Sequence, residues 1–161
     1  RTNDSTLTNN RSGTLTNLGT LISAGTLANT GTLTNDALLS NNGGTLTNSG
    51  SGTLTNDDEQ YNGGTLTNAS TLTNASDGTL YNTSTLTNQV GGTLISAGTL
   101  ANTGTLTNAG TLTIESGSTL SNAGTVTNAS GGRIESYIDD YYFALTESSN
   151  ANYVGGTVNL E

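Results

Sequence analysis

Residues 92–108 read GTLISAGTLANTGTLTN, and residues 19–35 carry the same letters. Within each copy a shorter unit, Gly-Thr-Leu-x-Asn/Ser-x, returns every six residues, and similar units fill most of the chain. A short unit that repeats at a fixed period is typical of a solenoid, in which each repeat stacks on its neighbours. The period therefore indicates the architecture before any single residue is considered.

Each six-residue unit predicts one short strand followed by a bend. In Thr-Leu-Thr, polar and apolar side chains alternate with period two, as in a strand with one buried face. Threonine is β-branched and favours strands, whereas a chain dominated by Thr and Gly disfavours helices. The following Asn-x-Gly suits a corner, because Asn and Gly both tolerate left-handed backbone. We expect an all-β protein, a β-solenoid in which each strand pairs with its equivalent in the next coil.

The leucines of these units form the predicted core. A leucine or another aliphatic residue occupies nearly every unit from Leu7 to Ile134, and coiling brings these side chains together in the interior. Burial of each leucine contributes roughly 1.5–3 kcal/mol, which offsets part of the chain entropy lost on folding. The core positions that we select are Leu15, Leu21, Leu27, Leu33, Leu94, Leu100, Leu106 and Leu112.

The spacing of the leucines bears on the number of sides in one coil. Most successive leucines lie six residues apart and several lie eight apart, if Gln60 is counted as a degenerate leucine position. When the gaps are numbered from Leu7–Leu15, every eight-residue gap has an odd number. We therefore expect a two-sided coil with roughly 12–14 residues per rung, and keep a three-sided coil of roughly 18–20 residues as the alternative. The two identical copies lie eleven leucine positions apart, which is a multiple of neither two nor three and counts against the two-sided coil.

The repeat pattern fails near the C-terminal end and divides the chain into two parts. Residues 1–134 are the predicted solenoid domain, and residues 135–161 form a tyrosine-rich segment. The open end of a solenoid exposes strand edges, so this segment is expected to be either a cap or a strand that joins the next molecule. The residues expected to take part in that assembly are Tyr137, Tyr141, Tyr142, Phe143, Tyr153, Val158 and Leu160.

Composition excludes several classes of function. The chain has no Cys and no His, so the usual nucleophile–base pairs and thiolate metal sites cannot form. We therefore expect no enzyme, no catalytic residues and no cofactor. The net charge of −9, with three Arg and no Lys, disfavours nucleic acid as a partner. No apolar run approaches the ~20 residues of a membrane-spanning helix.

The densest acidic cluster, Asp57-Asp58-Glu59, interrupts the repeats and is the candidate calcium site. Calcium needs six or more oxygen ligands on a shaped loop, and none of the known glycine–aspartate loop patterns is present. A solvated loop is the simpler interpretation, and we assign no metal site beyond this weak candidate.

Threonine pairs offer an alternative function. In Thr-x-Thr the two side chains lie ~6.7 Å apart on one face, and successive rungs are ~4.8 Å apart. This grid resembles the ice-binding face of β-solenoid antifreeze proteins. When leucine positions are sorted by parity, the odd ones keep Thr-x-Thr more often, so one face is expected to be more regular than the other. Threonine is also simply a good exposed strand residue.

The Gly-Thr-Leu-Thr-Asn units, such as Gly13–Asn17, Gly31–Asn35 and Gly104–Asn108, resemble the repeats of secreted bacterial β-solenoid surface proteins, the filamentous-haemagglutinin-like and autotransporter-type adhesins. The resemblance implies an extracellular or cell-surface stalk, fibre or adhesin. We expect a structural protomer that stacks end to end on itself, with a surface, a glycan or ice as a further partner. An ice-binding solenoid is the alternative.

Overall fold

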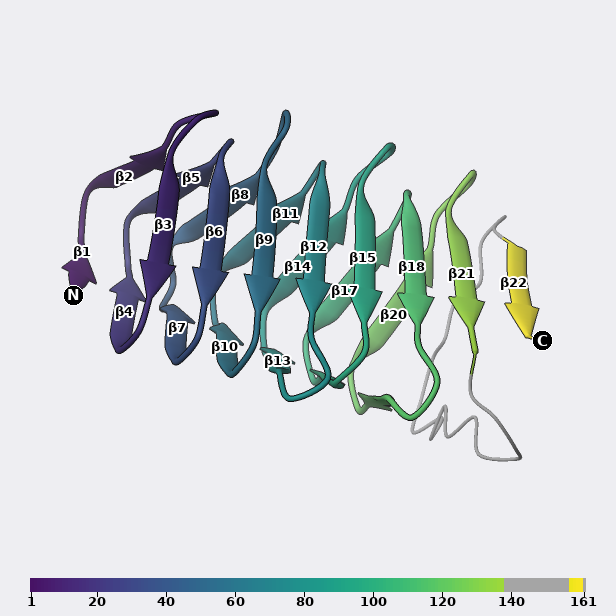
Figure 1. Cartoon of the computed structure of the whole chain (residues 1–161). Coiled ribbons are helices and arrows are strands. Elements are labelled where there is room, and N and C mark those ends of the chain that lie inside the picture. Colours follow the sequence, from purple (N-terminus) through teal and green to yellow (C-terminus); the bar gives the residue numbers. More distant parts are fainter. Residues whose placement is uncertain (138–156, 161) are drawn as a thin grey trace.

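The computed structural model describes residues 1–137 and the backbone of residues 157–160. The chain coils through three parallel sheets, which we name A, B and C, and visits them in that order seven times (Figure 1). The described residues contain strands and corners but no helix. The solenoid is therefore three-sided, and the expectation of a two-sided coil is wrong.

The strands of each sheet follow one another along the rod. Sheet A contains β1 (Thr2–Asn3), β4 (Thr20–Ser23), β7 (Leu38–Asn41), β10 (Glu59–Asn62), β13 (Thr79–Asn82), β16 (Thr99–Asn102) and β19 (Thr119–Asn122). Sheet B contains β2 (Thr6–Asn9), β5 (Thr26–Asn29), β8 (Thr45–Asn48), β11 (Thr65–Asn68), β14 (Thr85–Asn88), β17 (Thr105–Asn108) and β20 (Thr125–Asn128). Sheet C contains β3 (Thr14–Asn17), β6 (Thr32–Asn35), β9 (Thr53–Asn56), β12 (Thr71–Asn74), β15 (Thr93–Ser96), β18 (Thr111–Ile114), β21 (Arg133–Ser136) and β22 (Thr157–Leu160).

Corner lengths explain why the leucine spacing suggested two sides. The corner from sheet B to sheet C alternates between four and two residues along the rod, as in 9 to 14, 29 to 32 and 48 to 53. The four-residue form of this corner gives the long gaps 1, 7, 13 and 19. The corner from sheet C to sheet A also has four residues after β12 and after β18, which gives the long gaps 11 and 17. Within each set the gaps are a multiple of six apart, so all of their numbers are odd. The register confirms the longer coil, because Leu66 pairs with Leu86, twenty residues further on. This agrees with the three-sided alternative.

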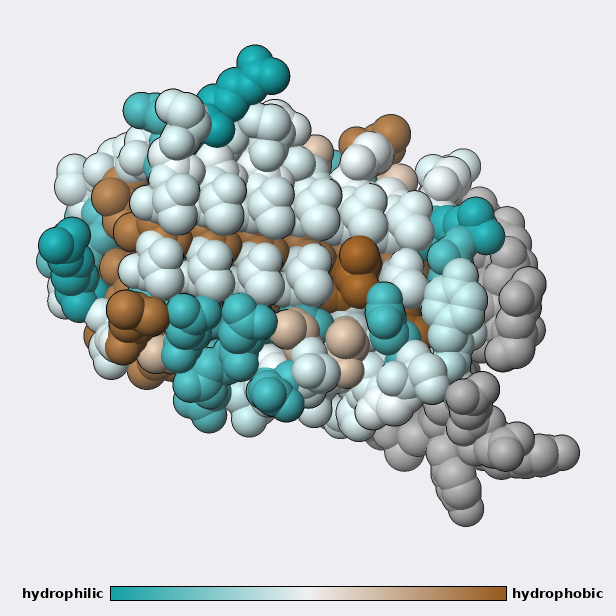
Figure 2. All heavy atoms as spheres, in the orientation of Figure 1, coloured by the Kyte–Doolittle hydropathy of each residue, from teal (hydrophilic) through white to brown (hydrophobic). Residues whose placement is uncertain are grey.

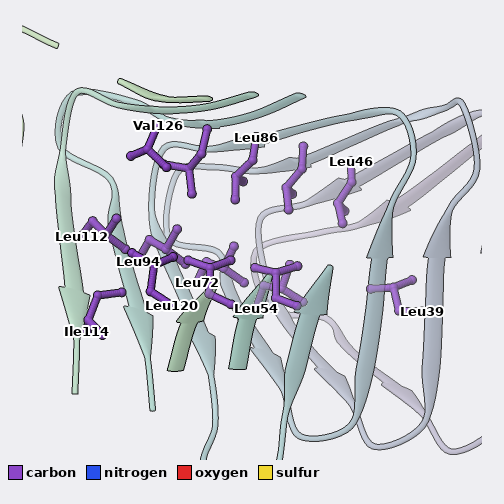
Figure 3. Close-up of a cluster of buried hydrophobic side chains, with 14 of the residues drawn as sticks. Leu39, Leu46, Leu54, Leu72, Leu86, Leu94, Leu112, Ile114, Leu120 and Val126 are labelled. Carbon is purple, nitrogen blue, oxygen red and sulfur yellow. The ribbon is translucent and has the colours of Figure 1, made fainter. Parts of the chain in front are cut away.

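The core is a stack of leucines that point inward from all three sheets (Figure 3). Of the selected core positions, Leu21, Leu27, Leu33, Leu94, Leu100, Leu106 and Leu112 are buried. Leu15 is only partly buried and packs against the first coils of the core. From the second coil onward, each coil places one inward side chain from each of the three sheets in this stack, so the interior is filled without a second layer of structure.

Buried asparagines form a second internal element. The asparagine that ends nearly every strand lies inside, where its Nδ2 donates to Oδ1 of the asparagine one coil further on; Asn29 to Asn48 measures 2.8 Å. The same Nδ2 also donates to a main-chain carbonyl of the next coil, that of Thr53 at 3.0 Å. The expectation that these asparagines occupy corners in left-handed backbone is therefore wrong. They give main-chain carbonyls a second donor, since the carbonyl of Gly31 accepts from Asn29 as well as from the main-chain N–H of Thr53.

Glycine has two different roles at the corners. Gly91, with a φ of +80°, adopts left-handed backbone in a four-residue corner, as expected of glycine. At the two-residue corner that holds Gly104 the reason is close approach, because a Cβ there would lie 2.1 Å from the main-chain oxygen of Ser84 in the preceding coil. Tight stacking of successive corners thus excludes a side chain at that point.

Candidate functional site

The outer face of sheet B carries the most regular array of side chains in the described part of the chain. The first and third residues of every strand point outward, and the first is threonine throughout, from Thr6 to Thr125. The third is threonine in all strands except β5, where it is Ala28. Five consecutive strands, β8, β11, β14, β17 and β20, therefore carry complete Thr-x-Thr pairs in register.

Sheet C carries a similar but interrupted array. Figure 2 looks onto this sheet, which shows two pale rows of side chains along the rod, the lower one broken by a brown side chain. Ile95 replaces the second threonine in β15, and β21 ends the array with Arg133 and Glu135, which form an ion pair. The odd leucine positions belong to strands of all three sheets, so the more regular face is not the one that parity predicted: sheet B is regular and sheet C is less regular.

Sheet A lacks complete Thr-x-Thr pairs in the described residues and carries an aromatic pair instead. Tyr61 of β10 and Tyr81 of β13 face outward in adjacent rungs, with ring centroids 4.5 Å apart and planes inclined by 13°. Small residues flank the pair along the same row, Ser40 on one side and Ala101 on the other. This stacked pair was not predicted from the sequence. The two tyrosines are twenty residues apart in the sequence. This separation predicts that they are neighbours only when one coil is known to contain three sides and about twenty residues.

A strip of carboxylates follows the corner between sheets C and A. Asp36, Asp57 and Asp77 lie in this corner in three successive coils. Partial burial, followed by the negative charge of Asp36 and a hydrogen bond with it, raises the pKa of the Asp57 carboxyl group above its usual 3.8. The carboxylates therefore repel one another across the coils, and the strip is the most strongly acidic part of the described surface.

The candidate calcium residues belong to this strip. Asp57 and Asp58 form the corner itself, and Glu59 is the first residue of β10. Across residues 1–137 no group of three or more acidic, Cys or His side chains is arranged to hold a metal ion. The calcium alternative stays a prediction without a shaped site.

The two edges of the solenoid differ. At the first coil, Leu7 and Leu15 are only partly covered, and an opening lined by Leu7, Leu15 and Leu21 leads from the end of the rod to the core. At the other end, β22 pairs in parallel with β21, and Val158 stands opposite Ile134 in the register.

The predicted assembly residues lie at this second end. Tyr137 follows β21 and is exposed. Val158 and Leu160 belong to β22, of which the structure describes the backbone. The others, Tyr141, Tyr142, Phe143 and Tyr153, lie outside the described residues. The role of this segment in joining molecules stays a prediction.

Comparison with known protein families gave one match. A sequence model of the haemagglutinin repeat matches the chain over residues 2–50, 31–84 and 78–136. Neither the curated proteins nor the solved structures that were searched gave a match. The structure describes no helix long and apolar enough to cross a membrane in the residues that it covers.

Proposed function

The chain belongs to the haemagglutinin-repeat family, and we propose that it is a structural, adhesin-like rod of the cell surface that extends by end-to-end stacking. Haemagglutinin repeats are typical of secreted surface proteins, and their solenoids are typically non-enzymatic. The matched residues coincide with the described coils, so the family assignment and the regular architecture concern the same part of the molecule.

The continuity of the three sheets is the observation that supports the proposed structural role. Strand pairing keeps one register in sheet B from β2 to β20. Columns of buried side chains run parallel to the sheets, so bending the rod would strain main-chain and side-chain hydrogen bonds together. A shape of this kind suits a stiff spacer that holds other parts of a surface protein at a distance.

End-to-end stacking is supported by the coil edges. Strands at an uncovered edge present unpaired N–H and C=O groups, which form a template for further strands. A contact that repeats without closing produces a filament. Negative-stain electron microscopy and sedimentation velocity over a range of protein concentrations test this proposal. Filaments with the width of one solenoid are expected, and rods of a single chain length at every concentration would contradict it.

Ice binding is the second candidate, and the threonine array of sheet B favours it. Its spacings of ~6.7 Å and ~4.8 Å form a flat, regular grid that extends over five rungs. Rigid, regularly spaced hydroxyl and methyl groups are what a crystalline partner requires, because every contact must repeat in register.

Thermal hysteresis with matched variants tests this second candidate. Thr85→Tyr places a bulky ring in the middle of the sheet B array, and Thr119→Tyr places the same ring on sheet A; both threonines are exposed. If sheet B binds ice, only Thr85→Tyr lowers the hysteresis and changes the shape of the crystals. Equal activity in the two variants, or no hysteresis in the unaltered protein, would exclude ice binding by this face. A glycan or another surface as the adhesive partner stays a prediction.

A further inference from the structure

One face of the Tyr61 ring is turned toward a row of smaller side chains on sheet A. The third residues of successive strands form this outward row, in which β4, β7, β10 and β13 contribute Ile22, Ser40, Tyr61 and Tyr81. The rings of Tyr61 and Tyr81 stack with their centroids 4.5 Å apart. The other face of the Tyr61 ring therefore points along the row toward Ser40, whose side chain is too small to cover it.

The residues around this ring face form a patch, which we call the Tyr61 patch and define as Leu38, Ser40, Glu59 and Tyr61. Leu38 and Ser40 point outward from β7, and Glu59 and Tyr61 point outward from the next strand, β10. Rungs are ~4.8 Å apart, which is close to the spacing of the two stacked rings. One planar group placed over Ser40 would thus continue the tyrosine stack at the spacing that it already has.

Carboxylates border the Tyr61 patch at the corner between sheets C and A. Asp36 precedes β7 in this corner, and Asp57 and Asp58 precede β10. In Figure 2, hydrophilic side chains gather along the edge of sheet C where the chain turns toward sheet A. The patch therefore combines an aromatic face with a strongly acidic border.

No arginine of the described residues neutralises this border. The ion pair that these residues form joins Arg133 to Glu135, three coils further along the rod than β10. Partial burial, followed by the charge of Glu59 and the contact with Tyr81, raises the pKa of the Tyr61 hydroxyl group above its usual 10.0. The negative charge of Glu59 is thus felt at the ring, and a positive group beside it would be attracted.

A guanidinium group matches these features. It is planar, stacks on aromatic faces and forms paired hydrogen bonds with carboxylates, so it can lie over Ser40 and bond to Glu59. The alkyl part of an arginine side chain can pack on Leu38. A lysine ammonium group lacks the planar stacking, and a neutral sugar gains nothing from the net negative charge.

We infer that the Tyr61 patch binds an arginine side chain from a basic peptide segment of another protein, with the guanidinium group stacked on Tyr61 and paired with Glu59. The inference goes beyond the proposed rod function, because it names a partner for the side of the rod. It does not depend on end-to-end stacking, since the patch belongs to the third and fourth coils of a single chain.

An NMR titration of the full chain with a capped tetra-arginine peptide tests the stacking. Ser40→Tyr places a third ring over the free face of Tyr61 and keeps all carboxylates. Thr47→Tyr adds the same ring on sheet B in the same coil and is the matched control, because both positions are half-buried. Ser40→Tyr should raise the Kd about three- to tenfold, and Thr47→Tyr should leave it unchanged.

A second pair of variants tests the charge. Glu59→Gln removes the carboxylate beside the ring, whereas Glu115→Gln removes one from an exposed corner three coils further on. In about 0.15 M salt, charges more than ~8 Å apart are largely screened. Glu59→Gln should therefore raise the Kd about threefold, and Glu115→Gln should leave it unchanged. The amide spectrum of each variant shows that it is folded.

The outcomes separate the inference from the proposed function. Equal affinity for all variants, or no binding to the unaltered chain, would overturn the inference, although end-to-end stacking would stand. A tetra-lysine peptide that binds as tightly as tetra-arginine would overturn the assignment to arginine. Chitotetraose that binds the unaltered chain but not Ser40→Tyr, with no response to tetra-arginine, would overturn it in favour of a glycan.

Discussion

The side-chain amide of Asn68 donates to the side-chain oxygen of Asn88, one coil further on, over 2.8 Å. Asn68 accepts the corresponding bond from Asn48 at 2.9 Å, and all three residues are fully buried. A polar side chain is thus stabilised in the interior because its neighbours above and below carry the same group in the same orientation.

Replacing one member of this column should be costly. Asn68→Ala leaves the amide nitrogen of Asn48 and the oxygen of Asn88 without their column partner. Each buried unsatisfied group costs about 1–3 kcal/mol, so for two such groups we expect the free energy of unfolding to fall by about 2–6 kcal/mol in urea denaturation. Asn42→Ala, at an exposed corner, is the control and should change it by less than about 0.5 kcal/mol. Similar losses in the two variants would show that the column contributes nothing specific.

Gln60 breaks the leucine stack of sheet A, between Leu39 and Leu80. It is fully buried, and neither atom of its amide has a hydrogen-bond partner. Gln60→Leu removes this unsatisfied group, so we expect a gain of about 1–3 kcal/mol in the free energy of unfolding. Gln89→Leu, at an exposed corner, should give no gain. A destabilised Gln60→Leu variant would mean that the site is too narrow for leucine or that the amide has a partner in solution.

The leucine stack itself can be tested with a buried and an exposed member of the same residue type. Leu66 is fully buried, whereas Leu18 is 78% exposed. Leu66→Ala leaves a cavity enclosed by three sheets and should cost about 2–5 kcal/mol, while Leu18→Ala should cost almost nothing. Thermal and urea unfolding measure both. Equal effects would contradict a core made of stacked leucines.

The carboxylate strip predicts a pH effect of defined sign. The pKa of Asp57 is raised by partial burial and then by Asp36, so the folded chain disfavours its ionised form. That penalty is present at neutral pH and is relieved as the pH falls through the raised pKa toward the usual 3.8. Asp57→Asn should therefore stabilise the protein at neutral pH but not in strong acid.

A direct titration checks the cause of this shift. Carbon-detected NMR of the Asp57 carboxyl group should give a pKa above the usual value in the unaltered chain. In Asp36→Asn it should move back toward the usual value, and added salt should have the same effect, since salt screens exposed charges. A pKa that does not respond to Asp36→Asn would assign the shift to burial alone.

Local sequence was sufficient to predict the strands and their inward residues. Thr-Leu-Thr alternates with the period of a strand, and leucines such as Leu94 and Leu100 lie where that alternation places them. The number of sides depends instead on which corners are long, and the alternating corner between sheets B and C imitates a two-sided pattern. The turn propensity of asparagine also predicted the wrong location, because the asparagines lie buried at the ends of strands. A buried amide is stable there only when the neighbouring coils supply hydrogen-bond partners. A single unit cannot reveal those partners.

The surface features, too, could be located only when the length of the coil was known. Tyr61 and Tyr81 are far apart in the sequence, and they become neighbours only when the coil length is fixed at twenty residues for that step. The threonine rows were visible as a composition, but their division between sheets B and C required the correct number of sides. Core positions can thus be derived from one unit, whereas surface positions require the whole coil.

The two identical segments occupy different sides of the rod. In residues 19–35 the strands are β4, β5 and β6 in sheets A, B and C, whereas in residues 92–108 they are β15, β16 and β17 in sheets C, A and B. Each six-residue unit of this segment thus occupies two different sides of the rod, and the smallest heritable increment of this molecule is one strand rather than one coil. Gain or loss of six residues would rotate everything downstream by a third of a turn while the interior stayed filled. Length variants should therefore fold alike but display their tyrosines, carboxylates and threonine rows toward different neighbours.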